Sequence, residues 1–500
     1  MAQLLFSNAC VVDGSGADPF CGDILVRADR IVEVASGIQA ESAERIDCTG
    51  LTLAPGFIDS HTHSDLQVIE GRTDKLRQGV TTEVIGNCGF SAYPPAHPAA
   101  DLRSFANGIF CGDDSWGWNS SEEYLRTIEQ SRTANVVSLV GHGSLRIAAA
   151  GSKQGPLSES QLGSMESLLE EAFDAGAAGF STGLMYAPGS SAPPEELQRL
   201  CNVTAKAGKI YTSHIRSYFS GLVDAVDEQL QLARRSGVRL QISHLQAVGA
   251  ANWPLQQVAI DHIEQARVDG VDAEFDCYPY VAGSSVLTQV LPQSALDGGV
   301  PVLIQRLCQP ASRRAIREEL NRINPWRWSD IYISSVGSQA NQALIGKHLQ
   351  EVAESRGTSP ADVTLDLLLE EKGDVNMLCF NQSMENLQIT LTHPCSTIIS
   401  DGFYVKGRPH PRLHGTFPLL LGSFTRDRGW LTLAQAVYKI TGKPAERYSL
   451  KQRGLLRPGY FADIVGFRAE AIDSPATYER PTEAPLGVQF VYRNGSKAGF

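Results

Sequence analysis

The 500-residue sequence has no long apolar run, no dense cluster of lysine and arginine, and no CxxC pair of cysteines. Its apolar runs are the length of a strand, so no membrane-spanning helix is expected. Residues 1–12 have neither the basic leader nor the cleavage site of a signal peptide. The ten cysteines are scattered, which predicts neither a disulfide framework nor a zinc ribbon. We therefore expect a cytoplasmic protein with reduced thiols.

The charge balance narrows the classes of partner. The net charge is −12 and the sequence pI is near 5.5, which argues against nucleic acid or an anionic membrane as the partner. Apolar residues make up 42% of the chain and charged residues 20%, enough for a large core of one barrel-sized catalytic domain and one smaller domain. A small molecule is the expected partner, and the composition also allows an oligomer.

Two kinds of hydrophobic pattern divide the chain into two regions. Residues 1–54 and 454–500 consist of short apolar runs separated by turn signals, which predicts one small discontinuous β domain, a β-sandwich formed by both termini. Residues 55–453 alternate strand and helix patterns. That alternation is typical of an α/β fold, here a (β/α)8 TIM-like barrel.

The barrel region contains one candidate strand too many. The nine candidates are residues 56–61, 81–87, 135–141, 177–183, 209–215, 239–245, 272–280, 375–381 and 396–402. Helices are expected at residues 158–176 and 223–237, the second with an acidic first turn and a glycine at its end. Residues 283–345 interrupt the alternation and predict an insertion over one mouth of the barrel. Either flanking strand could be the seventh of the barrel.

Reactive side chains recur at the ends of these strands. His61 and His63 follow the first candidate at spacing i, i+2, so they point to one side and can share a metal ion. Cys88 follows the second between glycines that permit tight turns. Three further strands end in the metal-capable residues His214, His244 and Asp401. Barrels of this class keep their chemistry at the carboxyl ends of the strands, so the six groups predict a metal site.

Each member also has a structural interpretation. A single histidine at a strand end is usually a hydrogen-bonded structural residue, and an HxH pair alone is a weak motif. Cys88 alone resembles a small buried hydrophobe, and Asp401 before a glycine could form a turn. The recurrence at equivalent positions favours the metal site. His142 has either a substrate or a structural role, and structural or surface roles are expected for His97, His262, His348 and His393.

Several motifs together carry a resemblance to a known family. They are APGFIDSHTHSD, GVTTEVIGNCGFS, GHGSLR, GFSTGLMYAPG, YTSHIRS, ISHLQAVG, DCYPYVAGSS, ISDG and HPRLHGTFPLLLG. In this order, over residues 50–465, the chain resembles the D-aminoacylase (N-acyl-D-amino-acid deacylase) branch of the amidohydrolase superfamily. An HxH pair with a GNCG cysteine, in place of a carboxylated lysine, distinguishes this branch from dihydroorotases and hydantoinases. The fourth strand region, AAGFSTGLMY, indeed has no lysine.

The resemblance implies roles for the six residues. Cys88, His214 and His244 match the tight zinc ligands of the family, and Cys88 also bridges toward a second, weaker site with His61 and His63. Asp401 matches a metal-site carboxylate that acts as the catalytic base. The implied reaction is zinc-dependent hydrolysis of the amide bond of an N-acyl amino acid, with an N-acyl-D-amino acid as the expected form.

Substrate binding is implied less directly. The candidates are Tyr186, Arg216, Gln246, Tyr278, Ser284 and Arg412. Gln246 is a departure, because the family often has a lysine here that binds a carboxylate, and a neutral amide cannot replace that charge. The identity of the leaving amine therefore stays open. His414 also stands where an aromatic residue such as tyrosine is common.

Two other classes of function remain. The first is a cyclic-amide hydrolase of the hydantoinase or dihydropyrimidinase type, against which Cys88 counts. The second is a non-catalytic homologue that keeps the barrel as a scaffold. A complete ligand set argues against the second, because a scaffold has no physical need to retain six clustered polar groups.

Overall fold

A closed barrel of parallel strands forms the centre of the computed structural model. Its strands are β6 (Phe57–Asp59), β7 (Val80–Ile85), β8 (Asn135–Gly141), β9 (Gly179–Gly183), β10 (Ile210–His214), β11 (Arg239–Ile242), β12 (Ala273–Cys277) and β16 (Ser396–Ile398). Each strand pairs with the next in this order. A parallel bridge between Thr62 and Gly402 joins the two ends of the sheet. The predicted barrel is confirmed.

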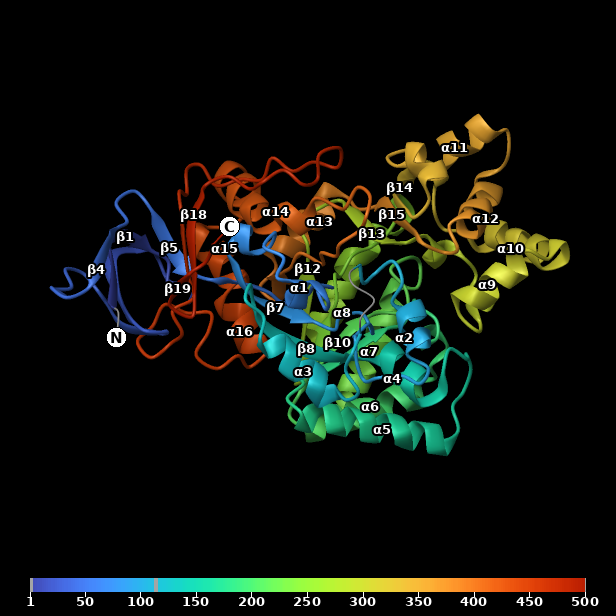
Figure 1. Cartoon of the computed structure of the whole chain (residues 1–500), viewed down its shortest axis with the longest axis horizontal. Coiled ribbons are helices and arrows are strands. Elements are labelled where there is room, and N and C mark those ends of the chain that lie inside the picture. The colour runs from blue at the N-terminus through green and yellow to red at the C-terminus, as the bar shows by residue number, and fades with distance from the viewer. Residues whose placement is uncertain (1–2, 112–115, 500) are drawn as a thin grey trace.

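Helices connect the barrel strands and continue beyond the last one (Figure 1). They are α1 (Gln67–Glu70), α2 (Ala99–Phe105), α3 (Ser121–Glu129), α4 (His142–Ala150), α5 (Glu159–Asp174), α6 (Pro194–Lys206), α7 (Leu222–Ser236), α8 (Leu255–Val268), α13 (Met384–Thr392), α14 (Arg412–Leu419), α15 (Leu433–Lys439) and α16 (Gly442–Arg447). Ser158 and Gln161 form a capping box at the start of α5. Gly237 ends α7 at φ 72°, as the glycine stop predicts.

The ninth candidate strand belongs to a second, smaller sheet. Between β12 and β16 the chain forms β13 (Ala282–Val286), β14 (Ile331–Val336) and β15 (Val375–Phe380), in the antiparallel order β13-β15-β14. Helices α9 (Val300–Leu307), α10 (Pro310–Ile323), α11 (Leu349–Arg356) and α12 (Pro360–Glu370) surround this sheet (Figure 1). The candidate at residues 375–381 is therefore β15, and the candidate at residues 272–280 supplies the seventh barrel strand.

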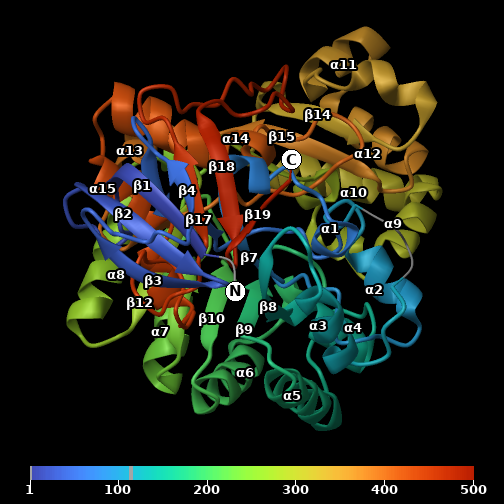
Figure 2. The same ribbon diagram turned by 60° about the vertical axis from the view of Figure 1, so that its left-hand side comes forward.

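Strands from both ends of the chain form one mixed sheet beside the barrel. They are β1 (Gln3–Val11), β2 (Phe20–Arg27), β3 (Arg30–Ala35), β4 (Glu44–Asp47), β5 (Thr52–Pro55), β17 (Ile464–Phe467), β18 (Val488–Arg493) and β19 (Ser496–Lys497). The antiparallel pair β5–β17 joins the two ends, and Figure 2 shows the blue strands of the N-terminal part beside the red strands of the C-terminal part. The β domain built from both termini is confirmed, while its boundaries at residues 54 and 454 stay a prediction.

The structure describes residues 3–111 and 116–499. Residues 1–2 and 500, at the ends of the predicted terminal domain, lie outside this part of the chain. Within the described ranges, no helix combines the length and the apolar character needed to cross a membrane.

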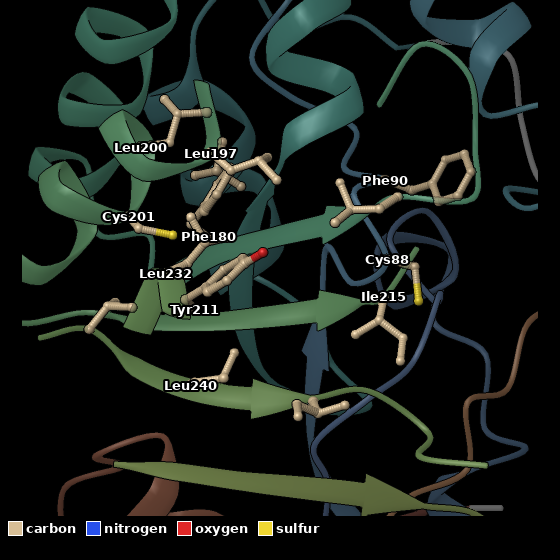
Figure 3. Packing of buried hydrophobic residues seen from close by; sticks show 14 of the residues in the cluster. Cys88, Phe90, Phe180, Leu197, Leu200, Cys201, Tyr211, Ile215, Leu232 and Leu240 are labelled. Carbon is tan, nitrogen blue, oxygen red and sulfur yellow. The ribbon is translucent and has the colours of Figure 1, made fainter. Parts of the chain in front are cut away.

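The largest core lies between the barrel strands and their helices. Phe180, Tyr211 and Leu240, on three consecutive strands, belong to one buried cluster with Leu200 of α6 and Leu232 of α7 (Figure 3). Burying a large apolar side chain of this kind stabilises the fold by about 1.5–3 kcal/mol. This packing fixes the strands rigidly, so that groups at their carboxyl ends are held at defined positions.

A buried ion pair lies at the joint between the first and last barrel strands. Lys75 is 3% exposed, and its Nζ lies 2.5 Å from Oδ2 of Asp59 and donates to Oγ of Ser400 at 2.9 Å. Oδ1 of Asp59 in turn accepts from the backbone N–H of Ser400 at 3.0 Å. Glu83 of β7 lies 3.6 Å from the same ammonium. One lysine therefore connects β6 and β7 with the residues that follow β16.

Replacing Lys75 by methionine should destabilise the fold strongly. The change leaves the carboxylates of Asp59 and Glu83 buried without their cation, and breaking a buried pair in this way costs about 3–5 kcal/mol. The measurement is the shift of the guanidinium chloride midpoint at an unchanged slope. The control Arg126→Ala removes an exposed pair with Glu122, and its expected effect is below about 0.5 kcal/mol. Equal midpoints for the two variants would contradict the role assigned to Lys75.

Candidate metal centre

Six metal-capable side chains converge at the carboxyl ends of the barrel strands. Their ligand atoms form three overlapping groups, each with all atoms within 4.8 Å of one another. The groups are His61, His63 and Cys88; Cys88, His214 and His244; and His61, His244 and Asp401. All six side chains are buried. The structure thus brings together every residue that the sequence proposed as a ligand.

The shortest distances connect the members of these groups. Sγ of Cys88 lies 3.2 Å from Nε2 of His61 and 3.4 Å from Nε2 of His244. Nδ1 of His214 lies 3.1 Å from the same nitrogen of His244. Oδ1 of Asp401 lies 3.4 Å from Nε2 of His61 and is also a neighbour of His63. The imidazole nitrogens, the sulfur and the carboxylate oxygen therefore face one shared volume.

The backbone is left-handed at three of these positions. Cys88 has φ 53°, His244 φ 34° and Asp401 φ 50°, a region that residues other than glycine rarely adopt. Gly183 packs directly against Cys88, and a side chain at this position would collide with the carbonyl oxygen of Cys88. Strained backbone of this kind persists where the surrounding structure holds it, and it is concentrated at functional sites.

Burial sets the protonation of the two histidines next to Cys88. It lowers the pKa of His244 to about 3, and it lowers the pKa of His214 well below its usual range. Both imidazoles are therefore neutral at pH 7, which is the form that binds a metal ion. Burial also raises the pKa of the Cys88 thiol to about 11, although His61 opposes the change. A bound metal cation removes such a proton, because thiolate is the ligating form.

The groups around His61 favour positive charge. Burial by itself would lower the pKa of His61, but Cys88, Asp276 and Asp401 outweigh it and raise the pKa well above its usual range. A cation bound at this point would satisfy the same three acidic groups. The donor set of thiolate, imidazole and carboxylate therefore fits a zinc ion, which prefers sulfur, nitrogen and oxygen ligands in such combinations.

Asp276 was not singled out in the sequence, although it supports two of the proposed ligands. It is 1% exposed, its Oδ1 accepts from the backbone N–H of His244 at 2.6 Å, and its Oδ2 lies 3.5 Å from Nδ1 of His61. Carboxylates commonly orient metal-bound histidines in this way. Its position near the end of the seventh barrel strand is the signal that could have identified it, because the same rule selected the histidines.

A cavity lies over the ligand set and is lined by five of its six members, all except His61. The space inside it, including the part open to solvent, is about 650 Å³. Five of the predicted substrate-binding residues line it: Tyr186, Gln246, Tyr278, Ser284 and Arg412. Nη1 of Arg412 lies 3.0 Å from Oδ2 of Asp401, and its guanidinium lies 4.7 Å from the ring centroid of Tyr278. The hydroxyl of Tyr278 donates to Oε1 of Gln246 at 2.9 Å. Asp401, Arg412, Tyr278 and Gln246 thus form one chain of contacts along the cavity wall.

Arg216, the sixth predicted substrate contact, does not line this cavity. Its guanidinium pairs with Glu228 at 2.9 Å and donates to the carbonyl of Ser190 at 2.8 Å. His142 is fully buried, and its Nε2 lies 2.8 Å from Oε1 of Glu196, which links α4 to α6. It is not part of the three ligand groups.

Sequence reasoning also passed over His410 and the aromatic residues Tyr218, Phe219 and Trp326. Nε2 of buried His410 donates to the carbonyl of Ala282, and its Nδ1 accepts from the backbone N–H of Arg412 at 3.0 Å. It thereby fixes the start of the helix that carries Arg412. Tyr218 and Phe219 reach the cavity from the loop after β10, and Trp326 reaches it from the segment between β12 and β16. No periodic pattern in the sequence marks these three residues.

The sequence matches the model of one protein family. Residues 44–284 and 398–496 match the Amidohydrolase family. The match covers barrel strands β6 to β12 and the strands β4, β5, β17 and β18 of the terminal sheet, and it omits β1 to β3 and the greater part of the segment between β12 and β16. Hydantoinases and dihydropyrimidinases share the fold at TM-scores of 0.53–0.56 with only 15–17% identity. They are similar to this chain in fold alone.

The closer relatives are deacylases. The chain is 35% identical to a D-aminoacylase of Alcaligenes xylosoxydans xylosoxydans and 33% identical to an N-acyl-D-glutamate deacylase of the same organism, covering 99% of this chain and 94% and 93% of theirs. An N-acyl-D-glutamate deacylase from Bordetella bronchiseptica, solved with zinc and a phosphonate inhibitor, superposes with a TM-score of 0.85 at 30% identity, over 99% of this chain and 96% of that one. A D-aminoacylase with a binuclear metal centre has a TM-score of 0.83 at 32% identity, with the same coverage.

The six converging side chains, the barrel that carries them and a match over well more than half of the chain agree. The chain belongs to the amidohydrolase family.

Proposed function

We propose that the protein is a zinc-dependent deacylase that hydrolyses the amide bond of an N-acyl-D-amino acid. The observation that carries the proposal is the group of Cys88, His214 and His244, whose ligand atoms lie within 4.8 Å of one another at the floor of a buried cavity. The names of the relatives support the substrate class, because they are a D-aminoacylase and deacylases of N-acyl-D-glutamate and N-acyl-D-aspartate.

The proposed ligands divide between two sites that share Cys88. Cys88, His214 and His244 would hold zinc tightly, while His61 and His63 would form a weaker second site with the same sulfur and Asp401 nearby. A bound zinc ion supplies Lewis-acid chemistry, since it polarises an amide carbonyl and lowers the pKa of water.

Asp401 is proposed as the catalytic base. Burial would raise its pKa, but Arg412 and the imidazole of His61 outweigh burial and hold the pKa well below its usual range. The carboxylate is therefore ionised at neutral pH and can accept the proton of the attacking water. It then donates that proton to the nitrogen of the leaving amine as the C–N bond breaks.

Arg412 is proposed to bind the carboxylate of the substrate. Among the described residues that line the cavity it is the one lysine or arginine, and it is 1% exposed. Its Nε has no hydrogen-bond partner within residues 3–111 and 116–499. A guanidinium matches the two oxygens of a carboxylate. Gln246 and Tyr278 would add neutral hydrogen bonds, so one permanent positive charge suits an amino acid with a single carboxylate.

A panel of N-acetylated amino acids of both hands tests the proposed function. With added Zn²⁺ we expect hydrolysis of the D-amino acid derivatives, little or none of their L-counterparts, and loss of activity after chelation. The readout is release of the free amine. Hydrolysis of hydantoin in the absence of any activity on the linear amides would contradict the proposal.

Replacing Asp401 by alanine should preserve zinc and remove turnover. Loss of a proton-transferring group typically lowers the rate by a factor of about 10²–10⁴. The measurement is kcat together with the zinc content of the purified protein. Asp227→Ala serves as the control, since that carboxylate pairs with His262 on the outside of the barrel and should leave both values unchanged. Activity near the wild-type level in Asp401→Ala would refute the assigned role.

Replacing Cys88 by alanine should remove the tightly bound metal. Without the sulfur the proposed tight site keeps two imidazoles, and we expect below about 0.5 zinc per chain after remetallation and dialysis. Cys201→Ala is the matched control, because Cys201 is equally buried but lies on α6, away from the cavity (Figure 3). Equal zinc content in the two variants would exclude Cys88 as a ligand.

A further inference from the structure

A second cavity adjoins the one above the ligand set. The space inside it, including the part open to solvent, is about 710 Å³. The two cavities share five lining residues, which form the wall between them: Phe90, Ile109, Met185, Tyr186 and Gln289. The ring centroid of Tyr186 lies 4.8 Å from that of His214, and the centroid of Phe90 lies 6.4 Å from that of His63. The second cavity therefore begins one side chain away from the proposed ligands.

The lining of this cavity is uncharged and largely apolar. Beyond the shared wall, its apolar side chains are those of Phe105, Ile147, Ala187, Pro188, Val286, Leu296 and Val300. The neutral polar residues Ser104, Asn107, Ser152, Thr288 and Gln289 complete the lining. No described residue that lines it is an aspartate, glutamate, lysine, arginine or histidine. Such a lining favours a hydrocarbon group and disfavours an ion, because a charge would lose its hydration without gaining a partner.

The second cavity reaches a part of the barrel mouth that lies away from Arg412 and Tyr278. One wall of it consists of residues that follow β7, β8 and β9, such as Phe90, Ile147 and Met185, and the rest comes from the segment between β12 and β16, for example Val286 and Val300. Arg412 and Tyr278 follow β16 and β12. In a closed ring of eight strands in the order β6 to β12 and then β16, strands β7, β8 and β9 stand across from β11, β12 and β16. The ligand set therefore lies between a cationic side and an apolar side.

A scissile amide has two substituents, and these sides distinguish them. If Arg412 holds the carboxylate of the amino acid, the amine half of the substrate occupies the side of β11, β12 and β16. The acyl half then extends in the other direction, past the wall formed by Phe90 and Tyr186. A short acyl group such as acetyl would end before this wall.

We infer that the second cavity binds the acyl chain of the substrate, so that the enzyme acts on N-acyl-D-amino acids with an extended hydrocarbon acyl group in preference to N-acetyl derivatives. This inference rests on the proposed deacylase function. Chain atoms beyond the amide carbonyl would contact Phe90 and Met185 first, and then Phe105, Ile147 and Val300. Burying a methylene group against such a lining raises kcat/KM by about three- to fourfold.

The test is a series of acyl chains on one D-amino acid. N-Acetyl, N-hexanoyl and N-decanoyl derivatives are assayed with the zinc-loaded enzyme, and the ratio of kcat/KM for decanoyl to that for acetyl is expected to exceed 100. Two variants fill the cavity from its half-buried rim, Ser152→Trp and Val300→Trp. Each should lower that ratio at least tenfold. Because the ratio is taken within one preparation, it does not depend on how much of a variant is folded.

Matched tryptophan substitutions serve as controls. Ser164 is exposed on α5 and Val268 is 81% exposed on α8, so Ser164→Trp and Val268→Trp should leave the ratio unchanged. Hydrolysis of the acetyl derivative with a flat response to chain length would overturn the inference while leaving the deacylase function intact. The same holds if the two cavity variants change the dependence on the amino-acid side chain and not that on the acyl chain. Failure to hydrolyse every member of the series would instead refute the proposed function.

Discussion

The joint between the first and last barrel strands determines the geometry of the site. At this joint Lys75 binds Asp59 of β6. Two residues further along, the backbone N–H of Asp401 donates to the carbonyl of His61 at 2.9 Å. The N–H of His63 donates to the carbonyl of Gly402 in the same way, at 3.0 Å. Residues some 340 positions apart thus become neighbours through main-chain hydrogen bonds. Closing the ring and assembling the ligand set are therefore the same structural event.

The sequence predicted the features that follow from periodicity and position. Alternating strands and helices define the barrel, and a reactive residue at the end of a strand must lie at the carboxyl face, which is why His214, His244 and Asp401 could be grouped without coordinates. The number of barrel strands could not be decided in this way. The strand at residues 375–381 has the same apolar character as a barrel strand, and its assignment depends on tertiary pairing with β13 and β14.

Other features depend on conformations that sequence patterns do not report. The backbone of Cys88, His244 and Asp401 is left-handed, a conformation that residues with a Cβ atom rarely adopt and that the strand pattern does not indicate. Arg216 and Arg412 look equally suited to binding an anion, yet one is satisfied by Glu228 and the other is directed at the ligand set. Only the positions of their neighbours separate the two. Asp276 shows the opposite case, because it lies near the end of a barrel strand, the position that identified His214, His244 and Asp401.

The segment between β12 and β16 can vary among related proteins without disturbing the barrel. Strands β12 and β16 are neighbours in the barrel, so the segment begins after one strand and ends before the strand that pairs with it. Its length and shape can change without altering the register of any barrel strand. The family match breaks off over most of this stretch, although Leu296 and Val300 from it face the second cavity. Evolution can thus change the residues that line the cavities through this segment, while the barrel strands and the six metal-capable residues stay the same.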